Sequence, residues 1–155
     1  MTCDEIRSAI SDYLSLIEGK IESHDEREKS LILALDRLAL AYHFSESNFD
    51  EKDYPDAPRG DYETLYHTSG DVFPNYGYYN VVADVSVNIA ETSVLVGDAI
   101  DDLADIALDM FEVIWLWENT STENALWQFR GGYENHWGEH LRNLQLYIKA
   151  NSDAV

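Results

Sequence analysis

Apolar residues recur with the period of an α-helix in four segments, and this periodicity restricts the fold more than any other feature of the sequence. The segments cover residues about 4–22, about 25–44, 97–118, and about 120 to nearly the C-terminus. The third is the most regular, and its apolar side is formed by Ile100, Leu103, Ala107, Met110, Phe111 and Ile114. Capping boxes precede three segments, at Thr2 with Glu5, Ser23 with Glu26 and Thr120 with Glu123. The sequence therefore predicts an all-α protein with four helices, the last of them weakened by Gly131, Gly132 and Gly138.

Residues 45–93 interrupt the helical pattern and contain all three prolines together with seven tyrosines and phenylalanines between positions 54 and 79. A connection longer than about 12–15 residues usually contains short elements or serves a function. We expect a short helix near 62–67, an extended run near 79–85, and aromatic side chains that pack onto the body. The predicted fold is a four-helix bundle with one long aromatic-rich crossover between the second and third helices, in a single helical domain over residues 1–155.

The composition limits the classes of partner. Asp and Glu number 30 against 10 Lys and Arg, which gives a net charge of -20, and 45% of the residues are hydrophobic, enough for a folded core. This field repels nucleic acids and anionic membranes, and it favours cations or basic proteins. Cys3 is the only cysteine, and the N-terminus lacks a signal-peptide pattern, so we expect a cytoplasmic protein without an intramolecular disulfide. No stretch approaches the roughly 20 apolar residues of a membrane span. The composition leaves the oligomeric state open.

Six acidic residues fall within an arc of about 100° on the third predicted helix, opposite its apolar side. No Lys or Arg occurs between Arg59 and Arg130. The acidic stripe is a solvated face, a docking surface for a basic protein, or a source of carboxylate ligands for a divalent cation. Its members are Asp98, Asp101, Asp102, Asp105, Asp109 and Glu112.

Two histidines, His136 and His140, lie four residues apart in the segment HWGEH of the fourth predicted helix. This spacing places both imidazoles on one side of a helix, where they are hydrogen-bonded core residues or ligands that share a metal ion with a third group such as His43. The segment also fits the H-x-x-E-H pattern of inverted zincins, but no matching downstream acidic ligand follows, so we reject a protease. The candidate ligands are Asp102, Asp105, His136 and His140.

Arg130 and Trp137 fall near the apolar side of the same helix and are interpreted as structural. We expect Arg130 to form an internal ion pair with Asp101 or Asp105. Trp137, with the other tryptophans, is expected to pack in or beside the core.

Three segments resemble a known family. They are GYYNVV at 77–82, GDAIDDLADI at 97–106 and ALWQFRGGYENHWGEHL at 125–141. Together they are similar to an uncharacterised bacterial family, domain of unknown function 5063. The resemblance implies a small helical bacterial protein without an assigned activity. It marks the positions Asp101, Asp102, Asp105, His136, Trp137, Gly138 and His140.

Two functions follow as hypotheses. The first is a non-enzymatic binding or regulatory module whose acidic stripe docks a basic protein partner, because the charge is large and recognisable catalytic motifs are missing. It requires no cofactor and assigns no catalytic residue. The alternative is a divalent-metal-dependent hydrolase of a small phosphorylated substrate, in which Asp98, Asp102 and Asp105 hold the metal and His136 or His140 carries a proton.

Overall fold

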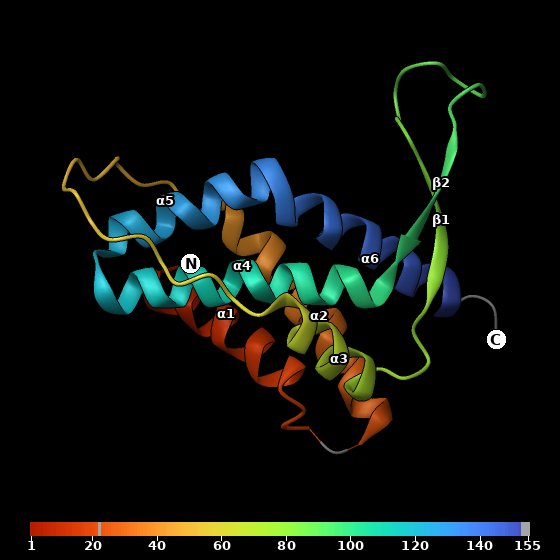
Figure 1. The fold of residues 1–155 in the computed structure, drawn as a ribbon, viewed down its shortest axis with the longest axis horizontal. Coiled ribbons are helices and arrows are strands. Elements are labelled where there is room, and N and C mark those ends of the chain that lie inside the picture. The colour runs from red at the N-terminus through yellow and green to blue at the C-terminus, as the bar shows by residue number, and fades with distance from the viewer. Residues whose placement is uncertain (22, 153–155) are drawn as a thin grey trace.

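The computed structural model describes residues 1–21 and 23–152, and it is mostly helical. A two-stranded antiparallel hairpin accompanies the helices, so the protein is mostly helical and not all-α. The strand at 78–82 overlaps the extended run expected near 79–85, whereas the strand at 94–98 was not predicted. The elements are shown in Figure 1. In chain order they are α1 (Cys3–Ile17), α2 (His24–His43), α3 (Tyr62–Val72), β1 (Tyr78–Val82), β2 (Val94–Asp98), α4 (Ala99–Asn119), α5 (Thr122–Gly132), a π-helical segment η1 (Tyr133–Trp137) and α6 (Gly138–Ser152).

Helix α4 lies at the centre and packs against α1, α3, α5 and α6, while α1 also packs against α2 (Figure 1). The apolar sides predicted from the sequence meet here, and burial of each large side chain contributes about 1.5–3 kcal/mol. The Tyr13 hydroxyl donates to the carbonyl oxygen of Leu103 at 2.8 Å, which satisfies a buried polar group between α1 and α4. The largest fully buried side chains include Trp137, Tyr13, Phe129, Ile6, Ile10 and Leu103.

The end of α1 and the cap of α2 differ from the sequence prediction. Helix α1 begins with the expected capping box of Thr2 and Glu5 but ends at Ile17, because Gly19 takes a φ of 78° that an α-helix cannot continue. The predicted end at position 22 lies outside the described residues. Ser23 is the N-cap residue of α2 without a side-chain cap hydrogen bond.

The third predicted capping box is wrong. Ser121, and not Thr120, caps α5 by accepting a hydrogen bond from the Asn124 backbone N–H at 3.1 Å. The Thr120 hydroxyl donates instead to the carbonyl oxygen of Leu116 at the end of α4. Both hydroxyls can satisfy backbone groups at a helix end, so the sequence pattern alone does not choose between neighbouring positions.

The long connection places one helix and one strand beside α4. Helix α3 is longer than the predicted 62–67 and packs along α4. Strand β1 begins at Tyr78, and β2 leads directly into α4. Over the described residues, we find no helix that is both long and apolar enough to cross a membrane.

Candidate metal-binding site

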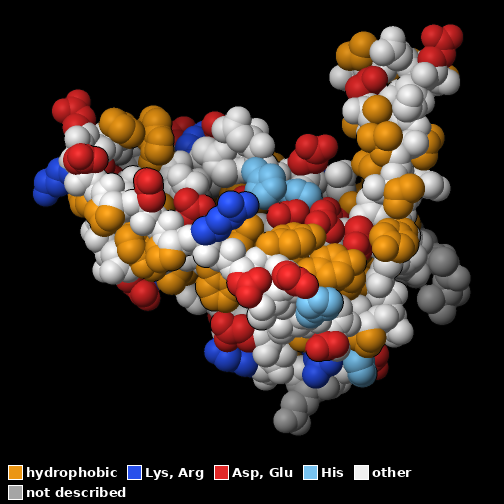
Figure 2. All heavy atoms as spheres, in the orientation of Figure 1, with side chains coloured by type: hydrophobic (Ala, Val, Ile, Leu, Met, Phe, Trp, Pro, Cys, Tyr) orange, Lys and Arg blue, Asp and Glu red, His pale blue; other side chains and the backbone are white. Residues whose placement is uncertain are grey.

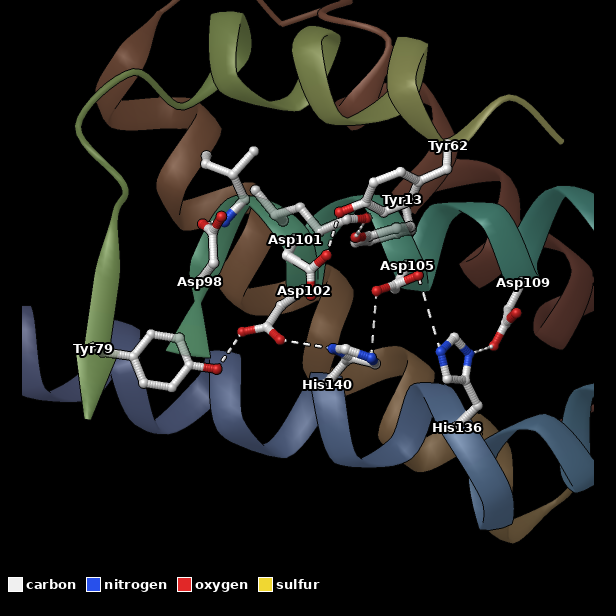
Figure 3. A network of polar contacts seen from close by, with 12 residues as sticks. Tyr13, Tyr62, Tyr79, Asp98, Asp101, Asp102, Asp105, Asp109, His136 and His140 are labelled. Atoms are coloured by element: carbon white, nitrogen blue, oxygen red, sulfur yellow. Dashed lines mark hydrogen bonds and ion pairs between the residues drawn. The ribbon is translucent and has the colours of Figure 1, made fainter. Parts of the chain in front are cut away.

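The acidic stripe on α4 lies between two neighbouring elements and is not a fully solvated face. None of its six side chains is fully exposed, and Asp102 is only 4% exposed. On one side, the Tyr62 hydroxyl of α3 donates to Asp101. On the other, the carboxylates of Asp102, Asp105 and Asp109 face histidines of η1 and α6 (Figure 3).

Asp98 is not a member of the helical stripe. It ends β2 and caps α4, because its Oδ1 atom accepts from the Ile100 backbone N–H at 2.9 Å. Its Oδ2 atom accepts from the Tyr66 hydroxyl at 2.7 Å. At the other end of the stripe, Glu112 accepts from Gln128 at 3.3 Å. The predicted stripe therefore contains carboxylates with different roles.

A π-helical segment brings the two histidines to α4. The predicted fourth helix is divided into α5, η1 and α6, with His136 in η1 and His140 in α6. Gly138 is required at the junction, because a Cβ atom there would lie 2.3 Å from the carbonyl oxygen of Tyr133. Trp137 is fully buried and its indole N–H donates to the carbonyl oxygen of Phe129 at 3.0 Å. π-Helical turns are rare and frequently occur at functional sites.

Each histidine contacts two carboxylates, one through each ring nitrogen (Figure 3). The Nδ1 atom of His136 lies 2.7 Å from Asp109, and the Nδ1 atom of His140 lies 2.7 Å from Asp102. Both Nε2 atoms face Asp105, at 3.9 Å for His136 and 3.5 Å for His140. We call these five residues the Asp–His cluster.

The charges of the cluster alter its proton affinities. Burial of the His140 ring opposes its charged form, but the hydrogen bond to Asp102 and the surrounding carboxylates outweigh burial and raise the pKa of His140 above 6.5. Burial raises the pKa of Asp102 above 3.8, although hydrogen bonds from His140 and Tyr79 oppose this rise. Burial also raises the pKa values of Asp105 and Asp109. The positive charge on His140 therefore offsets part of a crowded set of carboxylates.

Three tyrosines donate to the acids around α4, a role that the sequence analysis missed. Tyr62, Tyr66 and Tyr79 donate to Asp101, Asp98 and Asp102 respectively. The hydrogen bond to Asp98 is the main cause that raises the pKa of Tyr66 to about 12, so this hydroxyl keeps its proton at neutral pH. The abundance of tyrosine in 54–79 is visible in the sequence, but which carboxylate each one meets depends on how α3 and β1 pack.

The expected partner of Arg130 is wrong. Arg130 forms an ion pair with Glu134 at 3.5 Å and donates to the carbonyl oxygen of Tyr42 at 3.1 Å. Its side chain lies over the Tyr42 ring of α2 and not against the acids of α4. His43 is exposed and belongs to neither group of potential ligands among the described residues.

Asp105, and not the expected His43, lies close to both histidines. Ligand atoms of Asp105, His136 and His140 all lie within 4.8 Å of one another, close enough to converge on one ion. A second group with the same property contains Asp101, Asp102 and His140. Figure 2 shows pale blue and red side chains gathered over α4 and the η1–α6 region, on a face open to solvent. His136 is the more accessible histidine, with a side chain 45% exposed.

The described residues thus form a mostly helical fold in which one acidic helix, α4, faces histidines of η1 and α6. The chain belongs to the family described as domain of unknown function (DUF5063), whose model matches residues 2–150. This confirms the resemblance noted from the sequence. A search of curated proteins finds no match.

A solved structure shares the fold. It is the crystal structure of protein BF1032 from Bacteroides fragilis, which is 16% identical and superposes with a TM-score of 0.73. The similarity covers 94% of this chain and 89% of the other. At this identity the comparison supports the fold and says nothing about the cluster.

Proposed function

We propose that this protein binds a divalent transition-metal ion such as Zn²⁺ through Asp105, His136 and His140. The observation that carries the proposal is the orientation of the two imidazoles. Both Nε2 atoms face the same carboxylate, and both Nδ1 atoms lie at hydrogen-bonding distance from other carboxylates. Two imidazole nitrogens and one carboxylate oxygen are ligands that Zn²⁺ accepts.

Asp102 and Asp109 then have a defined role outside the ligand set. A metal-ligating histidine usually donates its other ring N–H to a carboxylate, which fixes the tautomer and strengthens the ligand. Asp109 provides this contact to His136, and Asp102 provides it to His140, each at 2.7 Å. A solvated acidic face does not require such paired contacts, whereas a metal site does.

Three protein ligands leave coordination positions for water. A metal ion held in this way lowers the pKa of a bound water and makes it a nucleophile near neutral pH. This supports the metal-dependent hydrolase of the sequence analysis as the finer proposal, with a small phosphorylated molecule as substrate. Asp98 is excluded from its proposed ligand set, because it caps α4 and accepts from Tyr66.

The test is zinc titration of protein prepared without a chelator or a histidine tag, measured calorimetrically against a competing chelator. We expect one ion per chain for the wild type. Loss of any ligand, in Asp105→Ala, His136→Ala or His140→Ala, should weaken binding by more than the 10–100-fold that loss of an outer contact costs. His67→Ala is the matched control, since His67 is an exposed histidine on α3.

A second variant separates the two possible groups of ligands. Asp101→Ala should retain zinc, because Asp101 belongs only to the alternative group with Asp102 and His140. Loss of zinc in Asp101→Ala together with normal binding in His136→Ala would contradict the proposed triad of ligands, Asp105, His136 and His140. Hydrolysis of p-nitrophenyl phosphate by the zinc-loaded protein tests the reaction separately. If zinc binds and no hydrolysis follows, the hydrolase is rejected while the metal site stands.

The second candidate is the docking of a basic protein partner on the acidic stripe. The ion pairs that Lys and Arg form among the described residues all involve acids outside the stripe. This supports the stripe as a surface for a basic partner. Binding of oligolysine should weaken steeply with salt and weaken further in the double variant Asp101→Asn with Glu112→Gln, which leaves the triad intact. Equal binding by this variant and the wild type would reject docking at the stripe.

A further inference from the structure

A second region carries a different inference. The hairpin formed by β1, β2 and the connection 83–93, here called the arm, projects away from the helices (Figure 1). It is attached at its base, where the Gly77 backbone N–H donates to the Tyr147 hydroxyl at 3.0 Å and the Tyr79 ring packs beside Tyr147. An isolated two-stranded hairpin is marginally stable in water. A projecting hairpin with apolar side chains therefore needs an explanation.

The pairing register separates the arm into two faces. Tyr79 pairs with Gly97 and Val81 with Leu95, and these side chains share the face on which Tyr79 reaches the body. The opposite face presents Tyr78, Val82, Val94 and Val96, which are all exposed, together with the polar residues Asn80 and Asp98. Tyr78 is 75% exposed and Val96 is 76% exposed. Exposed apolar residues continue around the connection at Val85, Val87 and Ile89.

The charge of the arm contrasts with that of the body. Residues 78–98 contain no Lys or Arg and three of the 30 acidic residues of the chain, Asp84, Glu91 and Asp98. Asp84 accepts hydrogen bonds from the Val87 backbone N–H and the Thr92 hydroxyl within the same connection. Because the chain carries a net charge of -20, two copies repel each other wherever their helical bodies meet. A second copy therefore meets less repulsion at the arm than at the acidic stripe of α4.

We propose that the arm is a self-association surface, and that two copies pack through the face of Tyr78, Val82, Val94 and Val96 around a two-fold axis. A two-fold contact uses the same surface on both copies, so an apolar face is complementary to itself. At roughly 60–120 Å² of apolar area per buried aliphatic side chain, the seven exposed side chains of the face and connection supply on the order of 400–800 Å². This approaches the roughly 800 Å² that each partner contributes to a standard interface.

The experiment is sedimentation velocity of the full chain over a concentration series. The wild type should reach the mass of two chains, and the double variant Val94→Lys with Val96→Lys should remain monomeric. The double variant Leu33→Lys with Leu146→Lys is the matched control, because these leucines are also exposed but lie on α2 and α6. It should dimerise as the wild type does. Helix content by circular dichroism should be the same in all three.

Two further measurements keep the test decisive. Replacing both arm valines by threonine retains β-branched side chains that favour a strand but lowers their apolar character, so dimerisation should weaken without loss of the hairpin. Added salt should strengthen the dimer, because it screens the repulsion between the acidic bodies. A monomeric wild type, including one that binds a different protein through the arm, or a dimer that survives the lysine substitutions, would overturn the proposal.

Discussion

In the Asp–His cluster, charged side chains lie between packed helices, whereas on the arm valines, tyrosine and isoleucine lie in solvent. The cluster buries Asp102 beside α6, and the arm leaves Val96 three-quarters exposed. Both arrangements cost free energy in an isolated chain, since buried charges lose hydration and exposed apolar groups retain ordered water. The cluster offsets its cost through contacts within the chain, while the arm has few contacts beyond its base.

This difference shows how each region is to be tested. Contacts already made within the chain hold the cluster, so substitutions there should change both folding and ligand affinity. The exposed face of the arm contributes little to folding, so substitutions there should change association alone. The following predictions examine this contrast through changes of decreasing size.

The largest effect is expected for Trp137→Ala at the base of the cluster. The Trp137 ring is fully buried against Phe129 and Tyr133, so its removal leaves a cavity and takes one of two hydrogen bonds from the carbonyl oxygen of Phe129, which still accepts from the Tyr133 backbone N–H. The free energy of unfolding should fall by about 3–5 kcal/mol. Urea denaturation measures it. A loss below about 1 kcal/mol, the size typical of an exposed site, would show that the cluster does not depend on this packing.

Asp109→Ala should have an intermediate effect, on zinc affinity. Without the carboxylate, the Nδ1 atom of His136 loses its hydrogen-bond partner, and affinity should fall by about 10–100-fold. Glu112→Ala is the matched control, because it removes the same charge from the same helix but its carboxylate contacts Gln128 and no histidine. Calorimetric titration of both variants measures the difference. Equal losses would indicate a general effect of charge and would count against an oriented His136.

The stability of the metal-free protein should decrease as the pH rises above 6.5. The pKa of His140 in the folded chain lies above 6.5, so its contribution is complete below 6.5 and is lost as the pH rises through the folded value. Zinc should reverse this trend, because the ion displaces the same proton and binds more tightly at higher pH. Thermal unfolding midpoints with and without zinc provide the measurement. His140→Gln should flatten the metal-free profile, and an unchanged slope in this variant would assign the pH dependence to other groups.

The smallest effect on folding is expected for Val96→Thr on the arm. Val96 is exposed and its β-branched shape is retained, so the free energy of unfolding should change by less than about 0.5 kcal/mol. Denaturation of dilute protein, below the concentration at which copies associate, measures this value. A loss above about 1 kcal/mol would mean that the valine packs within its own chain, and the contrast between the regions would fail.

Much of the helical framework is predictable from the sequence, because local period and caps determine it. The segment 97–118 gives α4 almost to the residue, and Thr2 with Glu5 gives the start of α1. Strand β2 is not predictable in the same way, because its apolar run VLV lies directly before a strong helix and pairs with residues 12 to 16 positions earlier. Which segment β2 pairs with depends on the tertiary structure.

The cluster is only half predictable for a similar reason. Spacing identifies the acids and the histidines separately, but the π-helical segment decides that they meet, and three glycines near it give only a weak indication of a break. The prediction for Arg130 is wrong for the same reason, since a helical wheel drawn for an uninterrupted helix assigns its side chain to the wrong side. The two faces of the arm are not predictable for another reason. A count of aromatic residues does not show that Tyr79 contacts α4 while its neighbour Tyr78 does not.

The centroids of the two imidazole rings lie 5.0 Å apart. This spacing depends on the wide π-helical turn of the backbone at η1. Rewinding that turn into ordinary α-helix would carry everything after it around the axis by about 100° for each residue of offset. His140 would leave Asp102, and at the same step Leu141, Leu144 and Ile148 would leave the core. The placement of the two histidines and the packing of α6 in the hydrophobic core therefore depend on the same π-helical turn, and a change in that turn would disrupt both.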